Sequence, residues 1–262
     1  MTDTVLVFEG QGATTIPGRP PLDLTALAPA EPQRAIVAHQ LGRARARVAA
    51  GAEVVGVVGQ SLGEVTALVV AGVLDEDDAL ELVRLRAELP AKLLPPADWT
   101  MASMTRLPSE RAEAAAAGHE LWVVGRNGPA DCIVVGHRAA FAAVVAQLGL
   151  SPHTWRELPV GAPYHTPAMA PVAEALAEAA AGCAWRDPVI PVVTPTGPGE
   201  VRTAADARRT VVAALTSPVA WSEALVTAAR LWPGAAWREC GPSVSLHRFV
   251  WKNGLTLDWD EA

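Results

Sequence analysis

Short apolar runs that end in glycine alternate along the chain with amphipathic stretches. Residues 4–8 (Thr-Val-Leu-Val-Phe) precede a glycine turn, and a second apolar run from Glu53 to Val58 leads into Gly-Gln-Ser-Leu-Gly at 59–63. Uninterrupted apolar runs of this length are typical of strands that are buried on both faces of a sheet. The second run continues into a helical stretch through Val70, which Gly72 closes. Strand, glycine turn and helix in this order predict an α/β fold with a parallel sheet.

The middle of the chain follows a different order and predicts a separate unit. Between residues 99 and 160, strand-like and helix-like segments follow one another as β-α-β-β-α-β, which is the signature of a ferredoxin-like unit. We therefore expect a large α/β subdomain of residues 1–98 and 161–262, and a small ferredoxin-like subdomain of residues 99–160. The strands of the small unit are expected at 100–105, 121–124, 132–135 and 153–158, and its helices at 109–117 and 138–148.

Turn and cap residues predict several boundaries in the large subdomain. A proline-rich loop from Pro17 to Pro32 precedes a helix that is expected from Gln33 to Ala49. Asp75 is the predicted N-cap of the next helix. Pro90 is expected to end or kink that helix, because proline lacks a backbone N–H. A further helix start is expected at Thr166-Pro167, and a strand at Val189–Val193.

Composition and charge restrict the possible classes of function. Half of the 262 residues are apolar, yet no stretch reaches the ~18 to 20 consecutive apolar residues of a membrane span, and the first residues lack a signal-peptide pattern. The net charge of -7 argues against affinity for nucleic acid or anionic membranes. Three widely spaced cysteines match neither a disulfide framework nor a metal site. We expect a cytoplasmic protein without a metal, nucleic-acid or membrane partner.

The Gly-x-Ser-x-Gly segment at 59–63 is the strongest chemical signal in the sequence. In a nucleophile elbow, a sharp strand-to-helix turn exposes the serine hydroxyl, and here the segment lies between an apolar strand and a helix. Ser61 is therefore the candidate nucleophile. The backbone N–H of Leu62 and a donor from Gln11 are candidates for an oxyanion hole. The alternative is a structural turn in which Ser61 only caps the helix.

A serine hydroxyl needs a base that accepts its proton, and histidine is the usual one. Of the six histidines, His165 lies in a loop, between Pro163-Tyr164 and the predicted helix start at Thr166. Loops are where side chains are most often directed into a cleft. The other five histidines lie on predicted helices or strand ends, so His165 is the candidate base.

Arg86 is predicted on the inward face of its helix. Ala79, Leu82 and Val83 precede it at helical spacing and form an apolar stripe with it. A buried guanidinium needs an anion, since burial of an unpaired charge is costly. The residues allow two interpretations, a structural salt bridge, for which Glu64 is a candidate partner, or a site for a substrate carboxylate.

Several motifs recur in an order that is typical of one enzyme family. They are residues 8–12 (Phe-Glu-Gly-Gln-Gly), 59–64 (Gly-Gln-Ser-Leu-Gly-Glu), 83–86 (Val-Arg-Leu-Arg), 127–129 (Asn-Gly-Pro), 162–166 (Ala-Pro-Tyr-His-Thr), 216–221 (Thr-Ser-Pro-Val-Ala-Trp) and 239–242 (Glu-Cys-Gly-Pro). Together they resemble the malonyl-CoA:acyl-carrier-protein transacylases of fatty acid synthesis and the acyltransferase domains of polyketide synthases. The first two are similar to the F-P-G-Q-G and G-H-S-L-G-E motifs of this family.

The resemblance implies both an architecture and a reaction. It implies a hydrolase-like α/β core with an inserted ferredoxin-like subdomain and, most often, a monomer. It also implies that Ser61 takes an acyl group from acyl-CoA while His165, oriented by backbone carbonyls, moves the proton. The phosphopantetheine thiol of an acyl carrier protein then accepts the acyl group, and no cofactor stays bound. Arg86 would pair with the free carboxylate of a malonyl-type group, and Asn127 would line the pocket.

The sequence also departs from this family pattern. Gln60 replaces the usual histidine before the nucleophile and changes the pocket wall. Tyr164 replaces a phenylalanine, and its hydroxyl is expected to narrow the pocket or to bind a polar acyl group. Pro90 stands where methionine is common. The region 13–50 is shorter than is usual, so part of the helical lid around the cleft is expected to be missing.

Transfer of a malonyl-type group to a carrier protein is the leading interpretation, and three alternatives remain open at this point. One is transfer of a different acyl group that CoA or a second carrier protein supplies. Another is hydrolysis of acyl thioesters to clear stalled carrier proteins, which the shortened lid favours and Arg86 disfavours. The third is a docking module without catalysis, which the presence of both Ser61 and His165 disfavours. The acyl group, the pathway and the oligomeric state are not specified by the sequence.

Overall fold

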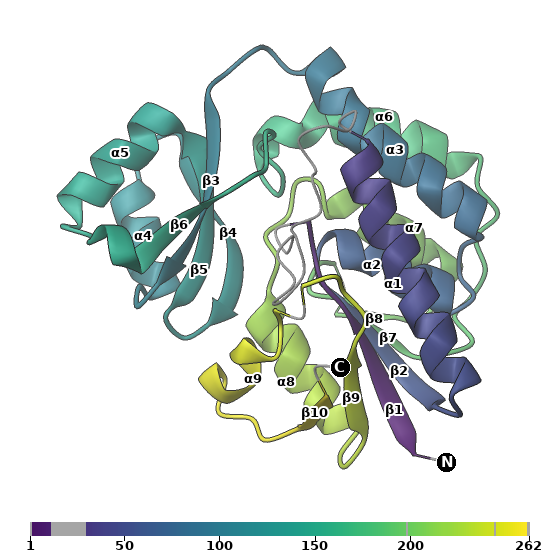
Figure 1. Ribbon diagram of the computed structural model, residues 1–262. Helices are drawn as coiled ribbons and strands as arrows, with labels where there is room; N and C mark the ends of the chain where they lie inside the picture. Colours follow the sequence, from purple (N-terminus) through teal and green to yellow (C-terminus); the bar gives the residue numbers. More distant parts are fainter. Residues whose placement is uncertain (1, 12–29, 198, 244, 261–262) are drawn as a thin grey trace.

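Two β-sheets organise the chain in the computed structural model, which describes residues 2–11, 30–197, 199–243 and 245–260 (Figure 1). The larger sheet has the strand order β10-β9-β1-β2-β7-β8, and the smaller has the order β4-β5-β3-β6. The strands are β1 (Asp3–Phe8), β2 (Glu53–Gly59), β3 (Trp99–Thr105), β4 (Leu121–Gly128), β5 (Asp131–His137), β6 (Trp155–Leu158), β7 (Val192–Val193), β8 (Glu200–Val201), β9 (Ala236–Glu239) and β10 (Asp258–Asp260). The helices are α1 (Glu31–Ala49), α2 (Leu62–Val70), α3 (Glu76–Leu93), α4 (Ser109–Ala116), α5 (Arg138–Gln147), α6 (Ala170–Ala181), α7 (Ala204–Ala213), α8 (Trp221–Leu231) and α9 (Arg248–Lys252), with short 3₁₀ turns at Pro152–Thr154 and Pro167–Met169.

The larger sheet is parallel except at one edge, and its central strand is buried on both faces. β1 pairs with β2 and β9 in parallel, whereas β7 pairs with β8 antiparallel. Leu6 and Phe8 face a core with α1, α2 and α3, whereas Val5 and Val7 face a core with α8. This burial on both faces explains why the sequence of β1 is an almost unbroken apolar run. The α/β class that the sequence predicts is confirmed.

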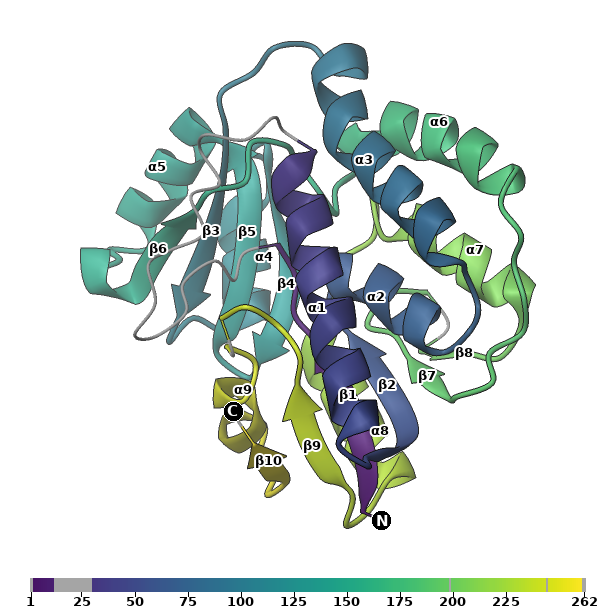
Figure 2. The same cartoon turned by 45° about the vertical axis from the view of Figure 1, so that its right-hand side comes forward.

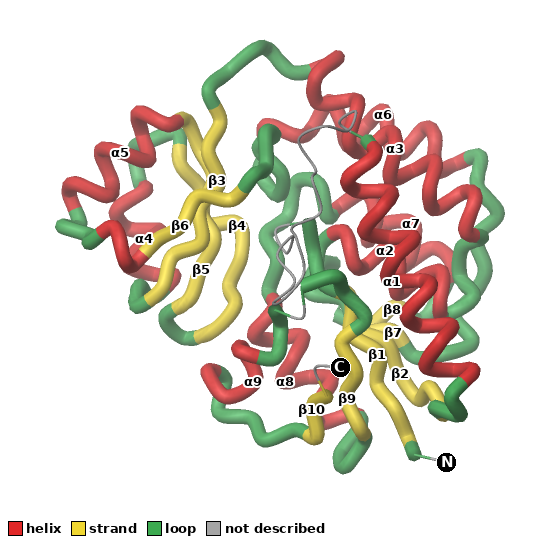
Figure 3. Tube along the Cα trace, in the orientation of Figure 1, coloured by secondary structure: helices red, strands yellow, loops and turns green. Residues whose placement is uncertain are grey.

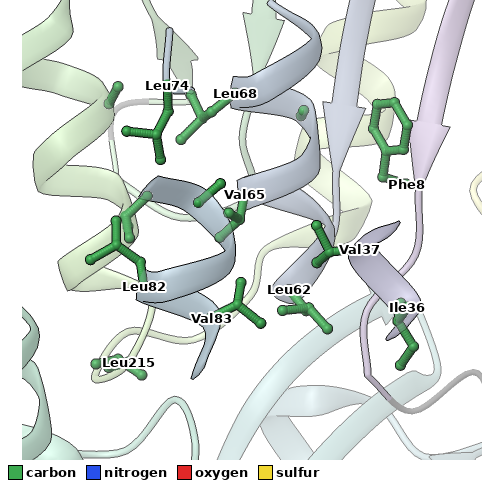
Figure 4. Close-up of a cluster of buried hydrophobic side chains, with 14 of the residues drawn as sticks. Phe8, Ile36, Val37, Leu62, Val65, Leu68, Leu74, Leu82, Val83 and Leu215 are labelled. Atoms are coloured by element: carbon green, nitrogen blue, oxygen red, sulfur yellow. The ribbon is translucent and has the colours of Figure 1, made fainter. Parts of the chain in front are cut away.

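Helix α2 is surrounded by the large core. Figure 4 shows Leu62, Val65 and Leu68 of this helix among side chains of the neighbouring elements. Those neighbours come from β1, α1, α3 and the loop after α7, namely Phe8, Ile36, Val37, Leu82, Val83 and Leu215. Because one turn of chain separates β2 from α2, this packing also fixes the position of the turn.

The smaller sheet is antiparallel and lies within the segment that the sequence assigns to the small subdomain. β3 pairs with β5 and β6, and β4 pairs with β5. Helices α4 and α5 cover the face that is turned away from the larger sheet (Figures 2 and 3). The opposite face contributes Met101, Ile133 and Leu158 to the wall of a cavity between the two sheets.

Asp75 stands at the predicted start of α3, but other details of the predicted boundaries differ from the structure. Helix α3 continues three residues beyond Pro90, to Leu93, since a proline near the end of a helix removes a single hydrogen bond. Asp75 occupies the N-cap position, but its carboxylate forms a salt bridge with Arg186 at 2.9 Å and makes no cap hydrogen bond. The strand expected at Val189–Val193 is reduced to β7. Most of the proline-rich loop and part of the shortened region 13–50 lie outside the described residues.

The start of α6 differs in a similar way. Thr166 precedes a 3₁₀ turn rather than the α-helix, and its hydroxyl donates to the carbonyl of Pro163 at 2.6 Å. The helix itself begins three residues later than the turn, at Ala170. The sequence pattern correctly predicted that a helical segment begins after Thr166, but the first three residues of this segment form a 3₁₀ turn instead of an α-helix.

The glycines of the turn after β2 are required by close backbone packing. A Cβ at Gly63 would overlap the carbonyl of Phe8, and a Cβ at Gly59 would overlap the backbone of Gly63. We predict that Gly63→Ala lowers the free energy of unfolding by about 2 kcal/mol or more, because neither backbone can move without disturbing the core. Urea denaturation followed by far-UV circular dichroism measures this.

Gly42→Ala is the matched control. Gly42 is exposed in the middle of α1, and a Cβ there would meet nothing within 4 Å. This variant should be more stable than the wild type by about 1 kcal/mol, the usual gain when alanine replaces glycine in a helix. Equal effects of the two substitutions would contradict the packing argument.

Candidate active site

Ser61 and His165 lie in direct contact at the junction of the two sheets. The Oγ of Ser61 is 2.8 Å from the Nε2 of His165, although 104 positions separate the two residues in sequence. Both residues have a positive φ, 53° for Ser61 and 68° for His165. Among the described residues that are not glycine, only Arg106 shares this conformation. Such backbone conformations cost free energy and concentrate at functional sites, where the surrounding packing enforces them.

The serine is positioned by a turn and does not cap the helix. Ser61 stands at the N-cap of α2, yet its side chain makes no cap hydrogen bond. The hydroxyl contacts His165 instead. This contact disfavours the alternative in which Ser61 is only a structural cap. Leu62 is the first residue of α2, so its N–H belongs to the first helical turn, where backbone donors have no partner within the helix.

Main-chain oxygens hold both the backbone and the ring of His165. Its backbone N–H donates to the carbonyl of Leu215 at 2.7 Å, and its Nδ1 lies 3.2 Å from the carbonyl oxygen of Ser217. A carbonyl can only accept, so Nδ1 carries the proton and Nε2 is left to accept the proton of Ser61. Burial, and secondly the nearby charge of Arg86, lowers the pKa of His165 to about 3. The ring is therefore neutral at neutral pH, as a base must be.

Arg86 reaches Ser61 from the buried face of α3. Its Nη2 is 3.5 Å from the Oγ of Ser61, and its Nη1 is 3.4 Å from the Oε1 of Gln11. A second hydrogen bond joins Nη1 to the side-chain oxygen of Gln33. Burial lowers the pKa of Arg86. Within the described part of the chain, no carboxylate forms an ion pair with this guanidinium.

Glu64 is not the salt-bridge partner of Arg86, contrary to one of the two interpretations of the sequence. Its Oε2 accepts hydrogen bonds from the hydroxyls of Thr194 and Thr196, the latter at 2.5 Å. Burial raises the pKa of Glu64 to about 7, against the lowering effect of its hydrogen bonds and of Arg86. The carboxyl group is therefore held by the loop after β7, and the guanidinium has neutral amide partners.

Tyr164 contacts Arg86 through both its ring and its hydroxyl. The guanidinium carbon lies 4.1 Å from the centre of the Tyr164 ring, a cation–π distance. The hydroxyl donates to the backbone carbonyl of Arg86 at 3.1 Å and accepts from the Nε2 of Gln33 at 3.1 Å. The hydroxyl therefore bonds to the protein itself, and the expectation that it narrows the pocket or binds a polar acyl group stays a prediction.

Gln60 and Asn127, which were both expected at the pocket, contact each other. The Nε2 of Gln60 donates to the Oδ1 of Asn127 at 3.2 Å, which joins the elbow to strand β4 of the small sheet. The backbone carbonyl of Asn127 in turn accepts from Asn253 at 3.0 Å.

A cavity of about 220 Å³ opens onto these groups. It lies between the two sheets, so residues of both subdomains form its wall. The predicted site residues that line it are Gln11, Gln60, Ser61, Arg86, Asn127, Tyr164 and His165. The side chain of Leu62 is buried in the core, and only its backbone N–H concerns the site. The structure thus brings together all the side chains that the sequence singled out.

Sequence reasoning missed several residues of the cavity and its supports. Arg156 and Arg248 line the cavity from opposite subdomains, and Gln33 holds Arg86. Glu9 stands where the related motif has proline, and its carboxylate accepts from the backbone N–H of Ser243 at 2.8 Å. The replacement of a proline inside a recognised motif was the one available signal for Glu9. The arginines and Gln33 lie outside any motif and gave no signal.

Comparison with known proteins places this geometry in a family. The profile of the acyl transferase domain matches residues 29–250. The malonyl CoA-acyl carrier protein transacylase of Escherichia coli K12 is 33% identical over 173 residues, which cover 64% of this chain and 56% of that protein. The chain thus matches little more than half the length of this curated relative.

Solved structures share the fold over nearly the whole chain. The malonyl-CoA:acyl carrier protein transacylase of Xanthomonas oryzae pv. oryzae has a TM-score of 0.87 and 26% identity, covering 99% of this chain and 94% of its own. The acyltransferase domain of an iterative polyketide synthase in enediyne biosynthesis has a TM-score of 0.81 and 32% identity, covering 100% and 66%. No described helix is long and apolar enough to cross a membrane. Since the family profile spans most of the chain, this protein belongs to the acyl transferase domain family.

Proposed function

We propose that the protein transfers a malonyl-type acyl group from acyl-CoA to the phosphopantetheine thiol of an acyl carrier protein, through an ester on Ser61. The observation that carries this proposal is the 2.8 Å contact between the Ser61 hydroxyl and the Nε2 of His165, in a cavity that also holds Arg86. The similar Escherichia coli protein is named for malonyl-CoA and the acyl carrier protein, which supports the same donor and acceptor.

Each half of the reaction uses the same groups. His165 takes the proton from Ser61 as the hydroxyl attacks the thioester carbonyl, and it returns the proton to the leaving thiolate. The backbone N–H of Leu62, with a donor from Gln11, stabilises the oxyanion that forms on the carbonyl oxygen. In the second half, His165 takes the proton of the carrier thiol as its sulfur attacks the ester carbonyl, and returns that proton to the Oγ of Ser61 as the ester bond breaks. No bound cofactor takes part.

The choice of acyl group follows from the distance between Arg86 and the nucleophile. Nη2 of Arg86 is 3.5 Å from the Oγ of Ser61, so an acyl group on this oxygen places its first few atoms beside the guanidinium. A malonyl group carries its carboxylate one carbon away from the thioester carbonyl. That carboxylate supplies the anion that the buried guanidinium lacks within the described chain, in a charge-assisted pair.

The architecture supports a finer description of the two units. We infer that the larger unit is hydrolase-like, because the candidate nucleophile sits in the turn between a central parallel strand and the helix that follows it. We infer that the smaller unit is ferredoxin-like, because its four strands are antiparallel in the order β4-β5-β3-β6, with two helices on one face. The cavity at their junction is then the natural place for the substrate.

The acyl-enzyme is the intermediate that tests the proposal. Incubation with malonyl-CoA should add the mass of one malonyl group to the wild-type protein, as intact-protein mass spectrometry would record. Ser61→Ala should form no adduct, because it lacks the nucleophilic oxygen. An adduct of equal yield on Ser61→Ala would contradict the assignment of the nucleophile.

Arg86→Ala should lower kcat/KM for malonyl loading by about a hundredfold. Loss of about 3 kcal/mol, the upper range for a hydrogen bond to a charged group, corresponds to this factor. Loading from acetyl-CoA, which has no carboxylate, should change little. Steady-state rates with the two donors give the ratio.

Arg84→Ala is the matched control for Arg86→Ala. Arg84 lies two positions away on the same helix, and its guanidinium bonds to Glu81 at 2.6 Å and to Glu88 at 2.7 Å on the protein surface. Its removal should leave the malonyl-to-acetyl ratio unchanged. If Arg84→Ala and Arg86→Ala change the ratio equally, Arg86 does not bind the carboxylate.

The low pKa of His165 predicts an unusual pH dependence. A base with the ordinary histidine pKa of 6.5 would lose activity tenfold per pH unit below that value, whereas His165, with a pKa of about 3, stays neutral. The rate constant for acylation of Ser61 should therefore stay level between pH 8 and pH 5, as rapid-quench measurements would record. A tenfold fall per unit below pH 6.5 would contradict the assigned environment of the ring.

The same pKa predicts a change in stability. Since the pKa of His165 is lower in the folded than in the unfolded protein, the neutral ring favours the folded state fully above pH 6.5 and progressively less below it. Relative to His165→Gln, the wild type should lose about 1.4 kcal/mol of unfolding free energy per pH unit between pH 6 and pH 4. Urea denaturation of both proteins at each pH measures this difference, and other titrating groups cancel in it.

A further inference from the structure

Helix α3 contains a defect one turn after Arg86. In an α-helix the N–H at position i+4 donates to the carbonyl at position i, so residue 90 would serve the carbonyl of Arg86. Residue 90 is proline, which has no N–H, and it lies inside the helix. The carbonyl of Arg86 therefore lacks its regular helical donor. Because both residues are buried, water does not readily take the place of that donor.

The donor comes from a different part of the chain. The hydroxyl of Tyr164 reaches the Arg86 carbonyl oxygen at 3.1 Å, although 78 positions separate the two residues. Both Pro90 and Tyr164 depart from the family pattern, in which methionine and phenylalanine are common at these positions. Each departure complements the other, since a phenylalanine at 164 would leave the carbonyl without this donor.

The same hydroxyl also connects to the guanidinium end of Arg86. It accepts from the Nε2 of Gln33 at 3.1 Å, and the Oε1 of Gln33 accepts from the Nη1 of Arg86. The ring of Tyr164 lies under the guanidinium at 4.1 Å. These contacts form a closed ring. It runs from the backbone carbonyl of Arg86 through the hydroxyl of Tyr164 and the amide of Gln33 to the guanidinium of Arg86, so it fixes both ends of this residue.

We propose that Tyr164 is a positioning residue for Arg86: its hydroxyl replaces the helical hydrogen bond that Pro90 cannot make and, through Gln33, holds the guanidinium beside Ser61. This inference rests on the proposed function, and it names the class of substrate that the ring of contacts selects, short acyl groups with a free carboxylate. Tyr164 need not touch the substrate for this role.

Tyr164→Phe tests the hydroxyl alone, because it keeps the aromatic ring. The KM for malonyl-CoA should rise about tenfold with kcat nearly unchanged, since a less ordered guanidinium weakens binding of the carboxylate before and during the reaction alike. The KM for acetyl-CoA should stay within twofold. A merely structural role would change both donors equally, and that result would overturn the proposal.

Rescue by Pro90→Ala is the sharper test. An alanine at position 90 supplies the missing N–H but does not restore the contact with Gln33, so the double variant Tyr164→Phe/Pro90→Ala should recover part of the malonyl preference that Tyr164→Phe loses. Pro96→Ala is the control, because Pro96 is exposed in the loop after α3. If Pro96→Ala rescues as well as Pro90→Ala, or if neither does, the hydroxyl does not replace the helical donor.

Thermal unfolding provides a readout that does not depend on activity. Tyr164→Phe should lower Tm more in the Pro90 background than in the Pro90→Ala background, because only the former leaves the carbonyl of Arg86 without a donor. Equal shifts would overturn the proposal even if the variants are inactive. If the wild type forms no malonyl adduct, the proposed function fails, while the Tm comparison still decides whether the two residues are coupled.

Discussion

Close contact between the backbones of β1 and α2 is the constraint on which the site depends. Gly63 packs against the carbonyl of Phe8, and Gly59 packs against Gly63, so the chain must reverse within a few residues. Ser61 takes a left-handed conformation as a result, with a φ of 53°. The apolar packing of α2 offsets the cost of this conformation and keeps the hydroxyl pointing toward the cavity. The position of Ser61 therefore depends on glycines and core leucines that do not line the cavity.

Two kinds of groups hold the side chains that line the cavity in place. On the side of Ser61 the supports are main-chain groups: the carbonyls of Leu215 and Ser217 hold His165, and the start of α2 presents the N–H of Leu62. On the side of Arg86 the supports are side chains, because its guanidinium contacts Tyr164 and Gln33. Main-chain supports survive substitution, whereas side-chain supports change with the sequence.

The sequence predicted what is local and periodic. The apolar run of β1, the elbow at Ser61 and the inward face that carries Arg86 all follow from spacing along one segment. Apart from the pairing of Ser61 with His165, it did not predict contacts between distant segments, such as the hydrogen bonds that Glu64 accepts from Thr194 and Thr196. Pro90 is the clearest case. The helix does not end there, and a tyrosine from another part of the chain donates to the carbonyl that Pro90 leaves without its helical donor, a contact that no local rule could reveal.

A crystal structure of the protein after reaction with malonyl-CoA tests the central claim most directly. The account predicts a malonyl ester on the Oγ of Ser61, with its carbonyl oxygen within hydrogen-bonding reach of the Leu62 N–H. Its free carboxylate should lie against the guanidinium of Arg86, with Tyr164 and Gln33 in their present contacts. An ester on another residue, or a carboxylate directed into solvent while Arg86 keeps only its amide partners, would contradict the account.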